Sequence, residues 1–592
     1  MPFYRQSRRL LLLSFLVLAV DDAMAALVAP RADQPVPADA VISVPIGDIG
    51  PDADWTDLLT RTFPATADVP EWVQAILDAL KAGSLDQAQA LIDTALASHR
   101  DEGMALELRG VLNARRGDLQ ASLADFERSV AASPGRGSPL TKLATVQMAM
   151  GQRDRASVNL RRALALDPHD RFAHQRLGLL LQERGDTAAA IEQFEAGIAG
   201  TPPAYVGVKA NLAALYLARG DAEKARDLLR PLAGAPSMTP TALRVLASAE
   251  LATGGAETAA RLFERATEQT PDDAGAWLGL GMARRAAGDP AAALGALERA
   301  GTLGAEPFAV NYQRGEALAA LERWSQAQEA FAAAGRADAR WRSLASRREA
   351  DMLAAAGKTD QAAAAYRALL DAGDAGPEVY AALSALFQKQ GRWDAALDIL
   401  QELVRAHPDD PQAQLRVGTL LASRTRYAEA LEHLDRGLAL APDDPGLLKA
   451  ASLARYRLGD LGQAIDAAER LLRQVPDDVN EMFYLATLYE ANRDGRAEAL
   501  YQQVLARDAD HVPSMNNLAL LVAARGDVDE ALALSRRAAE LAPDSAIVID
   551  TLGVTLLAAE QPREARRAFE HALSLDPDYA DARRHLESLG PP

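Results

Sequence analysis

Residues 270–303 read TPDDAGAWLGLGMARRAAGDPAAALGALERAGTL, and this stretch predicts two helices joined by one tight turn. Pro271 ends the helix before it, and Asp272 and Asp273 suit the N-cap and first turn of the next helix. Gly288 follows the helical run, at the place where a residue with positive φ closes a helix C-terminus. The stretch is therefore predicted to be one helix–turn–helix unit.

The same unit recurs along the chain with a period of about 34 residues. Glycine marks its turn, with one extra residue before Gly220 and with Glu322, Thr425 and Glu560 in the gaps. The turn glycines are Gly83, Gly117, Gly151, Gly185, Gly220, Gly254, Gly288, Gly357, Gly391, Gly459 and Gly526. Proline marks the other end of many units. These prolines are Pro134, Pro168, Pro202, Pro271, Pro408, Pro442, Pro476, Pro543 and Pro577.

Small and aromatic residues occupy fixed positions inside the units. Seven residues before the turn lie Gly110, Gly178, Gly281, Gly315, Gly418 and Gly553. Five residues after the turn lie Ala156, Ala190, Ala225, Ala293, Ala396, Ala430, Ala464, Ala531 and Ala565. Four residues further on lie Phe126, Phe194, Phe263, Phe331 and Phe569. We expect the small residues to let the two helices of a hairpin approach closely, and the phenylalanines to fill the space between hairpins.

This pattern resembles the tetratricopeptide repeat family, which has large–Leu–Gly–aromatic in the first helix and Ala–Phe–Ala–Pro in the second. Good copies are Trp277-Leu280-Gly281 with Ala293, Leu297 and Ala300, and Gly553 with Ala565, Phe569, Ala572 and Pro577. The resemblance covers roughly residues 69–578. It implies an all-α fold, a right-handed α-solenoid of about fifteen helix–turn–helix repeats.

Four places depart from the period. An extra residue enters near 200–203 and another near 334–340, DAGDAG at 371–376 replaces the expected proline, and the turn at 492–495 is one residue short. Each is either a local change of superhelix pitch or a flexible joint, and the sequence leaves both open.

Length and charge limit the function classes. The 592 residues exceed what one hydrophobic core holds, about 250–300 residues, which also favours a repeat array. The net charge of −19 makes nucleic acid and anionic membrane surfaces poor partners, because both are negatively charged. Aspartates at helix starts account for part of this charge, since they complement the helix dipole.

The N-terminus has the layout of a secretory signal peptide. Arg5, Arg8 and Arg9 precede the apolar run 10–20, which is too short to span a bilayer, and an Ala-x-Ala site ends at Ala25. We therefore predict a signal peptide at 1–25, a Pro-rich extended linker at 26–68, the solenoid at 69–577, and a capping helix and tail at 578–592. Whether the signal is cleaved or kept as an anchor, both outcomes place the chain outside the cytoplasm, in the periplasm, at the cell envelope or secreted. No transmembrane span is expected after processing.

No pattern in the sequence predicts chemistry. The chain has no cysteine, and its eight histidines include no pair with the i,i+4 spacing of metal ligands. Gly275, Gly279 and Gly281 lie inside a predicted helix without a preceding strand, so they do not form a phosphate loop. No nucleophile motif and no segment long enough for a catalytic domain remain. We therefore expect no catalytic, cofactor-binding or metal-binding residue, and no enzyme.

The family resemblance implies a concave surface lined by the first helices, at positions two, five, nine and twelve of each repeat. Those positions hold Phe172, Arg244, Leu278, Met282, Tyr312, Arg347, Leu415, Tyr456, Phe483 and Asn516, and about half of them are expected to pack on neighbouring repeats instead. This mainly apolar set suits an amphipathic helix or extended peptide of a partner protein. The lysines of the family's carboxylate clamp are missing, although Asn211 and Asn517 match one of its registers.

Arginines 336, 340, 342, 347 and 348 form a basic cluster. It is either a docking patch for acidic groups or a set of surface side chains in which Arg347 pairs with Asp351 and Arg348 is solvated.

Three functions compete. The first is an exported scaffold that binds partner proteins in its groove, by analogy within an exopolysaccharide-export or outer-membrane assembly system. The second is a structural protein that forms homo-oligomers through the solenoid. The third is an enzyme with an unrecognised site.

Overall fold

The computed structural model describes residues 70–590 except 99–100, 199–205, 237 and 374–375. The predicted signal peptide at 1–25 and linker at 26–68 lie outside these residues. Throughout the described part of the chain the regular structure is helical, without a strand. None of the helices there has both the length and the apolar composition needed to cross a bilayer.

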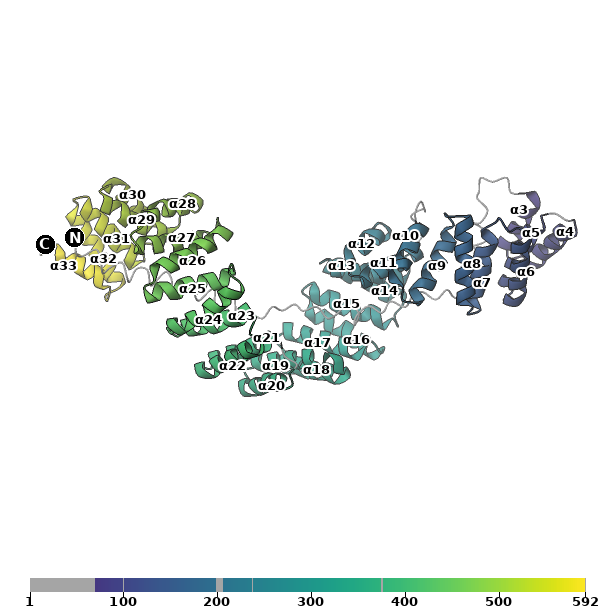
Figure 1. Cartoon of the computed structure of the whole chain (residues 1–592), viewed down its shortest axis with the longest axis horizontal. Helices are drawn as coiled ribbons and strands as arrows, with labels where there is room; N and C mark the ends of the chain where they lie inside the picture. The colour runs from purple at the N-terminus through teal and green to yellow at the C-terminus, as the bar shows by residue number, and fades with distance from the viewer. Residues whose placement is uncertain (1–69, 99–100, 199–205, 237, 374–375, 591–592) are drawn as a thin grey trace. The chain divides into compact units, whose positions relative to one another are not determined.

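Figure 1 labels the helices in chain order. The helices up to residue 355 are α3 Glu71–Lys81, α4 Leu85–Ala97, α5 Glu102–Arg115, α6 Leu119–Ala132, α7 Ser138–Ala149, α8 Arg153–Leu166, α9 Arg171–Glu183, α10 Thr187–Ile198, α11 Val206–Ala218, α12 Ala222–Leu229, α13 Pro240–Ala252, α14 Ala256–Gln269, α15 Ala274–Ala286, α16 Pro290–Thr302, α17 Pro307–Ala320, α18 Trp324–Ala337 and α19 Arg342–Ala355. The later helices are α20 Thr359–Asp371, α21 Pro377–Lys389, α22 Trp393–Ala406, α23 Pro411–Ser423, α24 Tyr427–Leu440, α25 Pro445–Leu458, α26 Leu461–Gln474, α27 Val479–Ala491, α28 Arg496–Arg507, α29 Val512–Arg525, α30 Val528–Leu541, α31 Ala546–Ala558, α32 Pro562–Leu575 and α33 Ala580–Ser588.

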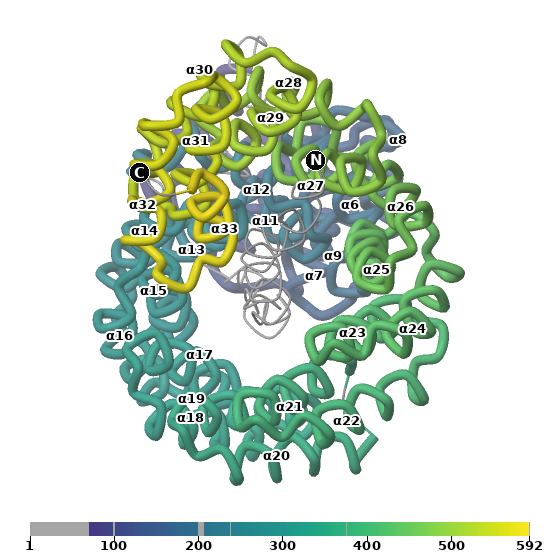
Figure 2. The backbone as a smooth tube through the Cα atoms, turned by 90° about the vertical axis from the view of Figure 1, so that its left-hand side faces the viewer, coloured from purple at the N-terminus to yellow at the C-terminus, as the bar shows by residue number. Residues whose placement is uncertain are grey.

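Within the described residues, α3 to α18 form eight consecutive hairpins and α21 to α32 form six, while α19 packs on α18, α20 packs on α21, and α33 follows the last hairpin. The odd-numbered helix of each pair is its first helix and the even-numbered one its second helix. The described chain divides into two compact units, an N-terminal unit up to Ala356 and a C-terminal unit from Gly357. Within the C-terminal unit, Figure 2 shows first helices such as α23 and α25 on the inner side of the curved stack and α24 and α26 on its outer side.

In the described chain, every turn between an odd-numbered helix from α3 to α31 and the even-numbered helix after it is closed by a residue with positive φ, as the repeat rhythm predicts. Eleven of the fifteen are the predicted turn glycines. Glu322, Thr425 and Glu560, which fill the gaps in the glycine series, take the same conformation, with φ of 57°, 60° and 57°. Arg493 does so between α27 and α28, with φ of 58°. The backbone therefore keeps the positive-φ turn even at residues other than glycine, for which this conformation has a higher free energy.

Six of the hairpins pack tightly because a large side chain of the second helix lies over a glycine of the first helix. A Cβ atom at Gly110 would lie 2.8 Å from the ring of Phe126, and one at Gly418 would lie 2.6 Å from Leu434. The same arrangement joins Gly178 to Phe194, Gly281 to Leu297, Gly315 to Phe331 and Gly553 to Phe569. Several of these phenylalanines also contact the element that follows their hairpin, as predicted. The Arg348 guanidinium on α19 lies 5.2 Å from the Phe331 ring, the rings of Phe569 and His585 lie 5.2 Å apart, and Phe263 reaches Gly279.

Aspartates cap the first helices, as the sequence predicts. Asp273 accepts a hydrogen bond from the backbone N–H of Ala276 at 3.0 Å, and Asp444 accepts one from Leu447 at 2.9 Å. This satisfies a backbone donor that has no partner inside the helix.

The irregular places take three forms in the described residues. The extra residue at 334–340 lies in a short 3₁₀ turn, Ala339–Trp341. At 371–376, α20 ends at Asp371, Gly373 has positive φ and α21 begins at Pro377. The shortening near 492–495 is not in the turn, because Arg493 stands one full repeat after Gly459 and keeps the turn conformation. It falls in α28, which has 12 residues where α26 and α30 have 14. The insertion at 200–203 lies outside the described residues.

Candidate functional site: the face of the first helices

Successive first helices contact one another at equivalent points. Carboxylates and cations about one repeat apart in the sequence form ion pairs between successive first helices, as in Glu107 with Lys142 and Lys449 with Glu481. A constant offset near the repeat length means that the first helices run parallel to one another. Their shared surface, called here the first-helix face, therefore presents the same helix positions side by side in each unit.

The N-terminal unit buries an ion cluster under this face. The Glu107 carboxylate on α5 lies 2.5 Å from the Lys142 ammonium on α7 and 2.9 Å from the Arg136 guanidinium, and it accepts a hydrogen bond from the Ser138 hydroxyl. Glu107 and Lys142 are almost fully buried, with 1% and 2% of their side chains exposed. Burial alone would raise the pKa of Glu107, but the two cations and the hydrogen bonds outweigh it and hold this pKa below its ordinary value.

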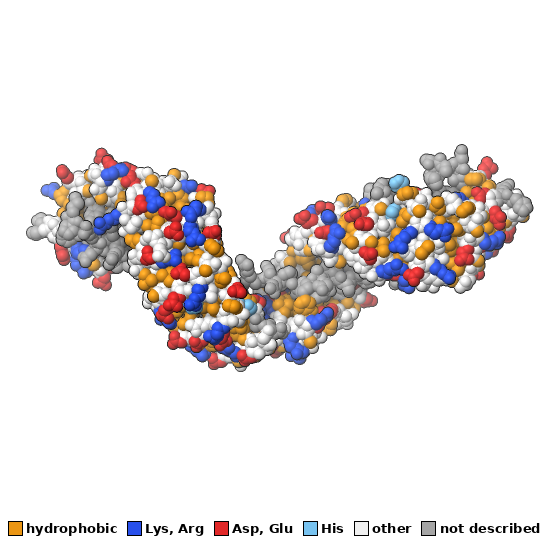
Figure 3. All heavy atoms as spheres, in the orientation of Figure 1, with side chains coloured by type: hydrophobic (Ala, Val, Ile, Leu, Met, Phe, Trp, Pro, Cys, Tyr) orange, Lys and Arg blue, Asp and Glu red, His pale blue; other side chains and the backbone are white. Residues whose placement is uncertain are grey.

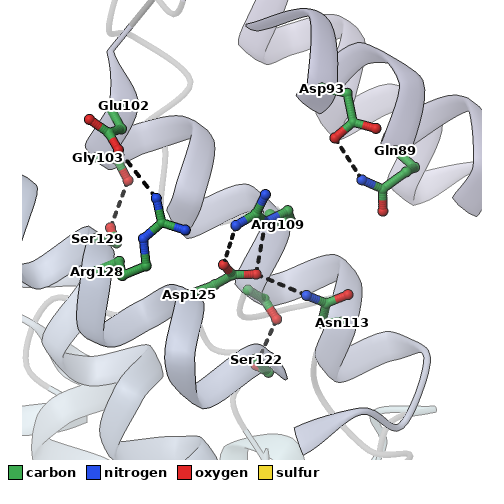
Figure 4. A network of polar contacts seen from close by, with 11 residues as sticks. Gln89, Asp93, Glu102, Gly103, Arg109, Asn113, Ser122, Asp125, Arg128 and Ser129 are labelled. Atoms are coloured by element: carbon green, nitrogen blue, oxygen red, sulfur yellow. Dashed lines mark hydrogen bonds and ion pairs between the residues drawn. The ribbon is translucent and has the colours of Figure 1, made fainter. Parts of the chain in front are cut away.

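A second polar network, shown in Figure 4, joins the two helices of the same hairpin. Arg109 on α5 makes two hydrogen bonds to Asp125 on α6, and Asn113 donates a third to the same carboxylate at 2.9 Å. The Ser122 and Ser129 hydroxyls donate to the backbone carbonyls of Gly110 and Gly103. These bonds join α5, the helix that carries Glu107, to α6.

Ion pairs and one contact between aromatic rings join elements of the N-terminal unit between α13 and α19. Arg244 on α13 pairs with the N-cap Asp273 of α15 at 3.0 Å. Arg348 on α19 pairs with Glu316 on α17 at 2.7 Å and with Asp351 at 3.0 Å. Burial next to Glu316 raises the pKa of Tyr312 to about 12, so this phenol stays neutral at physiological pH. The Tyr312 ring packs edge-on against Phe331, with ring centroids 5.3 Å apart.

The first-helix face of the C-terminal unit has an aromatic patch between α25 and α29. The Ser452 hydroxyl on α25 hydrogen-bonds that of Tyr484 on α27, and burial raises the pKa of this tyrosine. Phe483 contacts the rings of His511 and Tyr501, at centroid distances of 5.1 and 5.9 Å. Burial lowers the pKa of His511, which favours the neutral imidazole.

Charges of both signs are mixed over the rest of the surface. Figure 3 shows Lys and Arg side chains next to Asp and Glu in both units on the visible side. Pairs such as Arg299 with Asp272 and Arg470 with Asp443 link a second helix to the turn before its hairpin. In the part of the chain that the structure describes, no three His, Asp or Glu side chains gather as metal ligands would.

Comparison with family models matches the chain to "Tetratricopeptide repeat" over residues 73–136, 141–205, 244–306, 382–445 and 449–495, and a second model with the same description matches 512–578. The chain belongs to the tetratricopeptide repeat family. The hairpins within the matched residues are thus tetratricopeptide repeats, and the fold class predicted from the sequence, an all-α repeat solenoid, is confirmed.

Solved structures give distant similarities. The Naa15/Naa10 complex bound to HypK-THB has 12% identity and a TM-score of 0.33, covering 82% of this chain and 96% of that one. A chain of the APC/C hetero-tetramer Cut9-Hcn1 has 13% identity and a TM-score of 0.32, covering 84% of this chain and 98% of that one. A tetratricopeptide repeat protein from Parabacteroides merdae has 18% identity and a TM-score of 0.29, covering 40% and 93%. Comparison with curated proteins gives no match.

The structure separates the predicted groove residues into two groups. Half-buried side chains, which keep a part open to solvent, are those of Phe172, Arg244, Met282, Arg347, Tyr456 and Phe483. Buried ones are Leu278, Tyr312, Leu415 and Asn516. Tyr312 and Asn516 were expected to offer their side chains to a partner, and their burial corrects this. The position within the repeat does not by itself determine how exposed a side chain is. The residue that faces it on the next first helix also matters. Leu415 lies over Gly446, which has no side chain to occupy that space.

The basic cluster near residue 340 also differs from the prediction. Arg348 is not solvated, since its side chain is 22% exposed and paired with two carboxylates. One of these is Asp351, the residue that the sequence predicted as the partner of Arg347. Arg340 pairs with Asp338, while Arg336 and Arg342 are exposed. The cluster therefore offers less uncompensated charge than its sequence suggests.

Sequence reasoning missed the cluster of Glu107, Arg136 and Lys142. One signal was available, because Lys142 stands in the otherwise apolar or neutral run 139–146, where a lysine needs a buried partner. Nothing in a single sequence identifies that partner, which lies on the first helix of the preceding repeat.

Proposed function

We propose that the chain is a non-enzymatic, exported scaffold that binds a segment of a partner protein along its first-helix face. The observation that carries this proposal is that the first-helix face of each unit bears half-buried apolar and aromatic side chains, Phe172 and Met282 in the N-terminal unit and Tyr456 and Phe483 in the C-terminal unit. Such side chains still expose apolar surface and gain free energy when a partner covers them.

The charges on the face support a peptide partner of mixed character. Arg244, Glu316, Arg348 and Glu481 are already paired across neighbouring first helices, so little of their charge remains to select an acidic or a basic ligand. Binding then depends on the apolar anchors and on shape. Parallel helices that present apolar anchors on one face suit an amphipathic helix or an extended peptide.

The sequence features at 1–25 support export, and with it a role in the periplasm or cell envelope. Exopolysaccharide export and outer-membrane assembly are the envelope processes in which we place such a scaffold.

Crosslinked capture from the envelope fraction tests this function. The variant carries Phe172→Ala, Met282→Ala and Phe483→Ala, and we expect it to recover partner proteins at least about tenfold less well than the unmodified chain, because each truncation removes apolar contact. The control is Val158→Ala, since Val158 is 56% exposed on a second helix, α8. Equal recovery by the triple variant and the control, with equal helical circular dichroism, would overturn the proposal. Tyr312→Ala is unsuitable here, because this buried side chain supports the fold.

Self-association is the alternative function, and the two ends of the array weigh against an end-to-end form of it. The exposed residues of α3 include Glu71, Gln74 and Asp78, and those of α33 include Arg583 and Glu587. Polar ends of this kind cover a repeat stack against further repeats. Light scattering over a hundredfold concentration range distinguishes the two functions, because a constant monomer mass removes the self-associating one.

A further inference from the structure

Helix α33 covers the C-terminal end of the last repeat. It packs on α31 and α32, and its Ala582 is fully buried in the apolar cluster that contains Ile549 and Phe569. Leu586 and Leu589 of α33 are half-buried against the same cluster. Because these side chains shield apolar surface of α31 and α32 from water, α33 acts as the cap of the array.

A polar contact joins this cap to α31. The His585 imidazole on α33 lies against the Asp550 carboxylate on α31, with Nδ1 and Oδ1 2.9 Å apart. The two residues are 35 positions apart in the sequence, the same offset as between Glu107 and Lys142. The cap contact therefore repeats the ion pair that joins successive first helices, with one chemical difference. A lysine keeps its charge at physiological pH, whereas an imidazole loses its proton near neutral pH.

Two buried carboxylates lie on the helices that this contact joins. The side chains of Asp550 and Asp581 are 5% and 2% exposed. Arg584 pairs with Asp581, whose second oxygen Oδ2 is buried without a hydrogen-bond partner in the described part of the chain. The two carboxylates, Arg584 and His585 therefore sum to zero charge when the imidazole is protonated and to −1 when it is neutral. Burial raises the pKa of Asp550, and the nearby His585 and Arg584 offset this only in part.

The other groups around His585 come from α32 and from the turn before α33. The Phe569 ring on α32 packs against the imidazole, with ring centroids 5.2 Å apart. Arg566 of α32 donates to a backbone carbonyl just after α33. The Tyr579 phenol is half-buried, and burial raises its pKa, so it stays neutral. The remaining charged side chains between residues 567 and 587 are exposed to solvent, so the charge on His585 decides whether the buried charges balance.

We propose that α33 is a pH-sensitive cap, which docks firmly in acid and loosens as the pH rises through the range in which imidazoles lose their proton, about pH 5.5–7.5. A protonated His585 gives the buried Asp550 carboxylate a charged partner, and loss of this proton leaves a buried negative charge with less compensation. Asp550 acts in the same direction, because a carboxyl whose pKa is raised in the folded state favours the fold in acid and opposes it as the pH rises. Loosening of α33 uncovers Phe569 and the apolar end of the last repeat, so the pH decides whether this end of the array is closed.

Hydrogen exchange of the full chain, measured by mass spectrometry at about pH 5.5 and about pH 8, tests the cap. The measurement gives protection factors, which are corrected for the intrinsic pH dependence of exchange. We expect the α33 amides to be about tenfold less protected at the higher pH, because the charged hydrogen bond is lost. The α25 amides serve as an internal reference and should change little. His571→Gln is the matched control, since His571 is exposed on the adjacent α32, and this variant should keep the full pH dependence.

Two variants at position 585 separate the effect of charge from that of packing. His585→Gln should make the protection of α33 low at both pH values, and His585→Lys, which carries a permanent charge, should make it high at both. Equal protection of α33 in the unmodified chain at the two pH values overturns the proposal. The same holds for a pH dependence that survives in both variants at position 585 or disappears in His571→Gln. A cap that is loose at both pH values in His585→Lys assigns the contact to packing and also overturns it.

Discussion

Two ion pairs join successive first helices in the two units, and they differ mainly in burial. Glu107 and Lys142 of the N-terminal unit expose 1% and 2% of their side chains. Glu481 and Lys449 of the C-terminal unit expose 11% and 40%, at a nearly identical N–O distance of 2.6 Å against 2.5 Å. The same two residue types at the same distance therefore have different effects. The buried pair favours one register of α5 against α7, because any other register would leave a buried charge without its partner. The more exposed pair contributes little to the register of α25 against α27, because water solvates its ammonium group.

The largest expected effect is that of breaking the buried pair. Lys142→Met leaves the Glu107 carboxylate buried with Arg136 as its remaining cation, and we expect a loss of about 3 kcal/mol of local stability. Hydrogen exchange measured by mass spectrometry checks this through the protection of the α5 and α7 amides. The double variant Glu107→Gln with Lys142→Met is the control, because it removes both charges and should recover most of the loss. If α5 and α7 keep full protection in the single variant, the pair is not a structural constraint.

The second prediction concerns acid. The pKa of Glu107 is lowered in the folded chain, so its contribution to stability is present above the ordinary glutamate pKa, 4.5, and is lost as the pH falls through the folded value. We expect α5 and α7 to lose protection below about pH 4.5. Glu107→Gln should flatten this part of the pH profile, and an unchanged profile in that variant would assign the acid sensitivity to other carboxylates. The effect should be smaller than that of Lys142→Met, because the hydrogen-bond partners stay in place.

The third prediction compares the contribution of packing near Glu107 to the stability of the fold with that of its ion pair. Gly110→Ala places a Cβ atom 2.8 Å from the Phe126 ring, and we expect a loss of about 1–2 kcal/mol. Adding Phe126→Leu makes room and should restore part of it, since the third hairpin has Ala144 and Leu160 at the corresponding positions. Thermal unfolding followed by circular dichroism measures both variants. A stable Gly110→Ala variant would mean that the first hairpins relax more readily than their geometry suggests.

The smallest effect is expected in the C-terminal unit. Lys449→Met should cost less than about 1 kcal/mol, because an exposed ammonium in water gains little from its partner. Protection of the α25 and α27 amides in the variant and in 1 M salt should change by similarly small amounts. A loss as large as that of Lys142→Met would remove the distinction between the two pairs.

The groove residues show how far single positions can be predicted. Phe172, Met282 and Phe483 keep exposed surface, whereas Tyr312 and Asn516 are buried although their repeat positions are equivalent to exposed ones. Periodicity gives the side of the helix, which is a local property. Exposure depends on the side chain that the next repeat places against it, and that side chain is distant in the sequence.

By itself, the sequence determined the repeat length, the helix ends, the turns and the family. Those features follow from residues close together in the chain, such as glycine after a helix and aspartate before one, and even Glu322, Thr425 and Glu560 were placed correctly in the turns. Only the tertiary structure decided that Phe126 fills its own hairpin, that Arg348 is paired and that Glu107 lies between two cations. Each of these contacts joins residues on different helices, and packing between helices selects among partners that a local pattern leaves equally available.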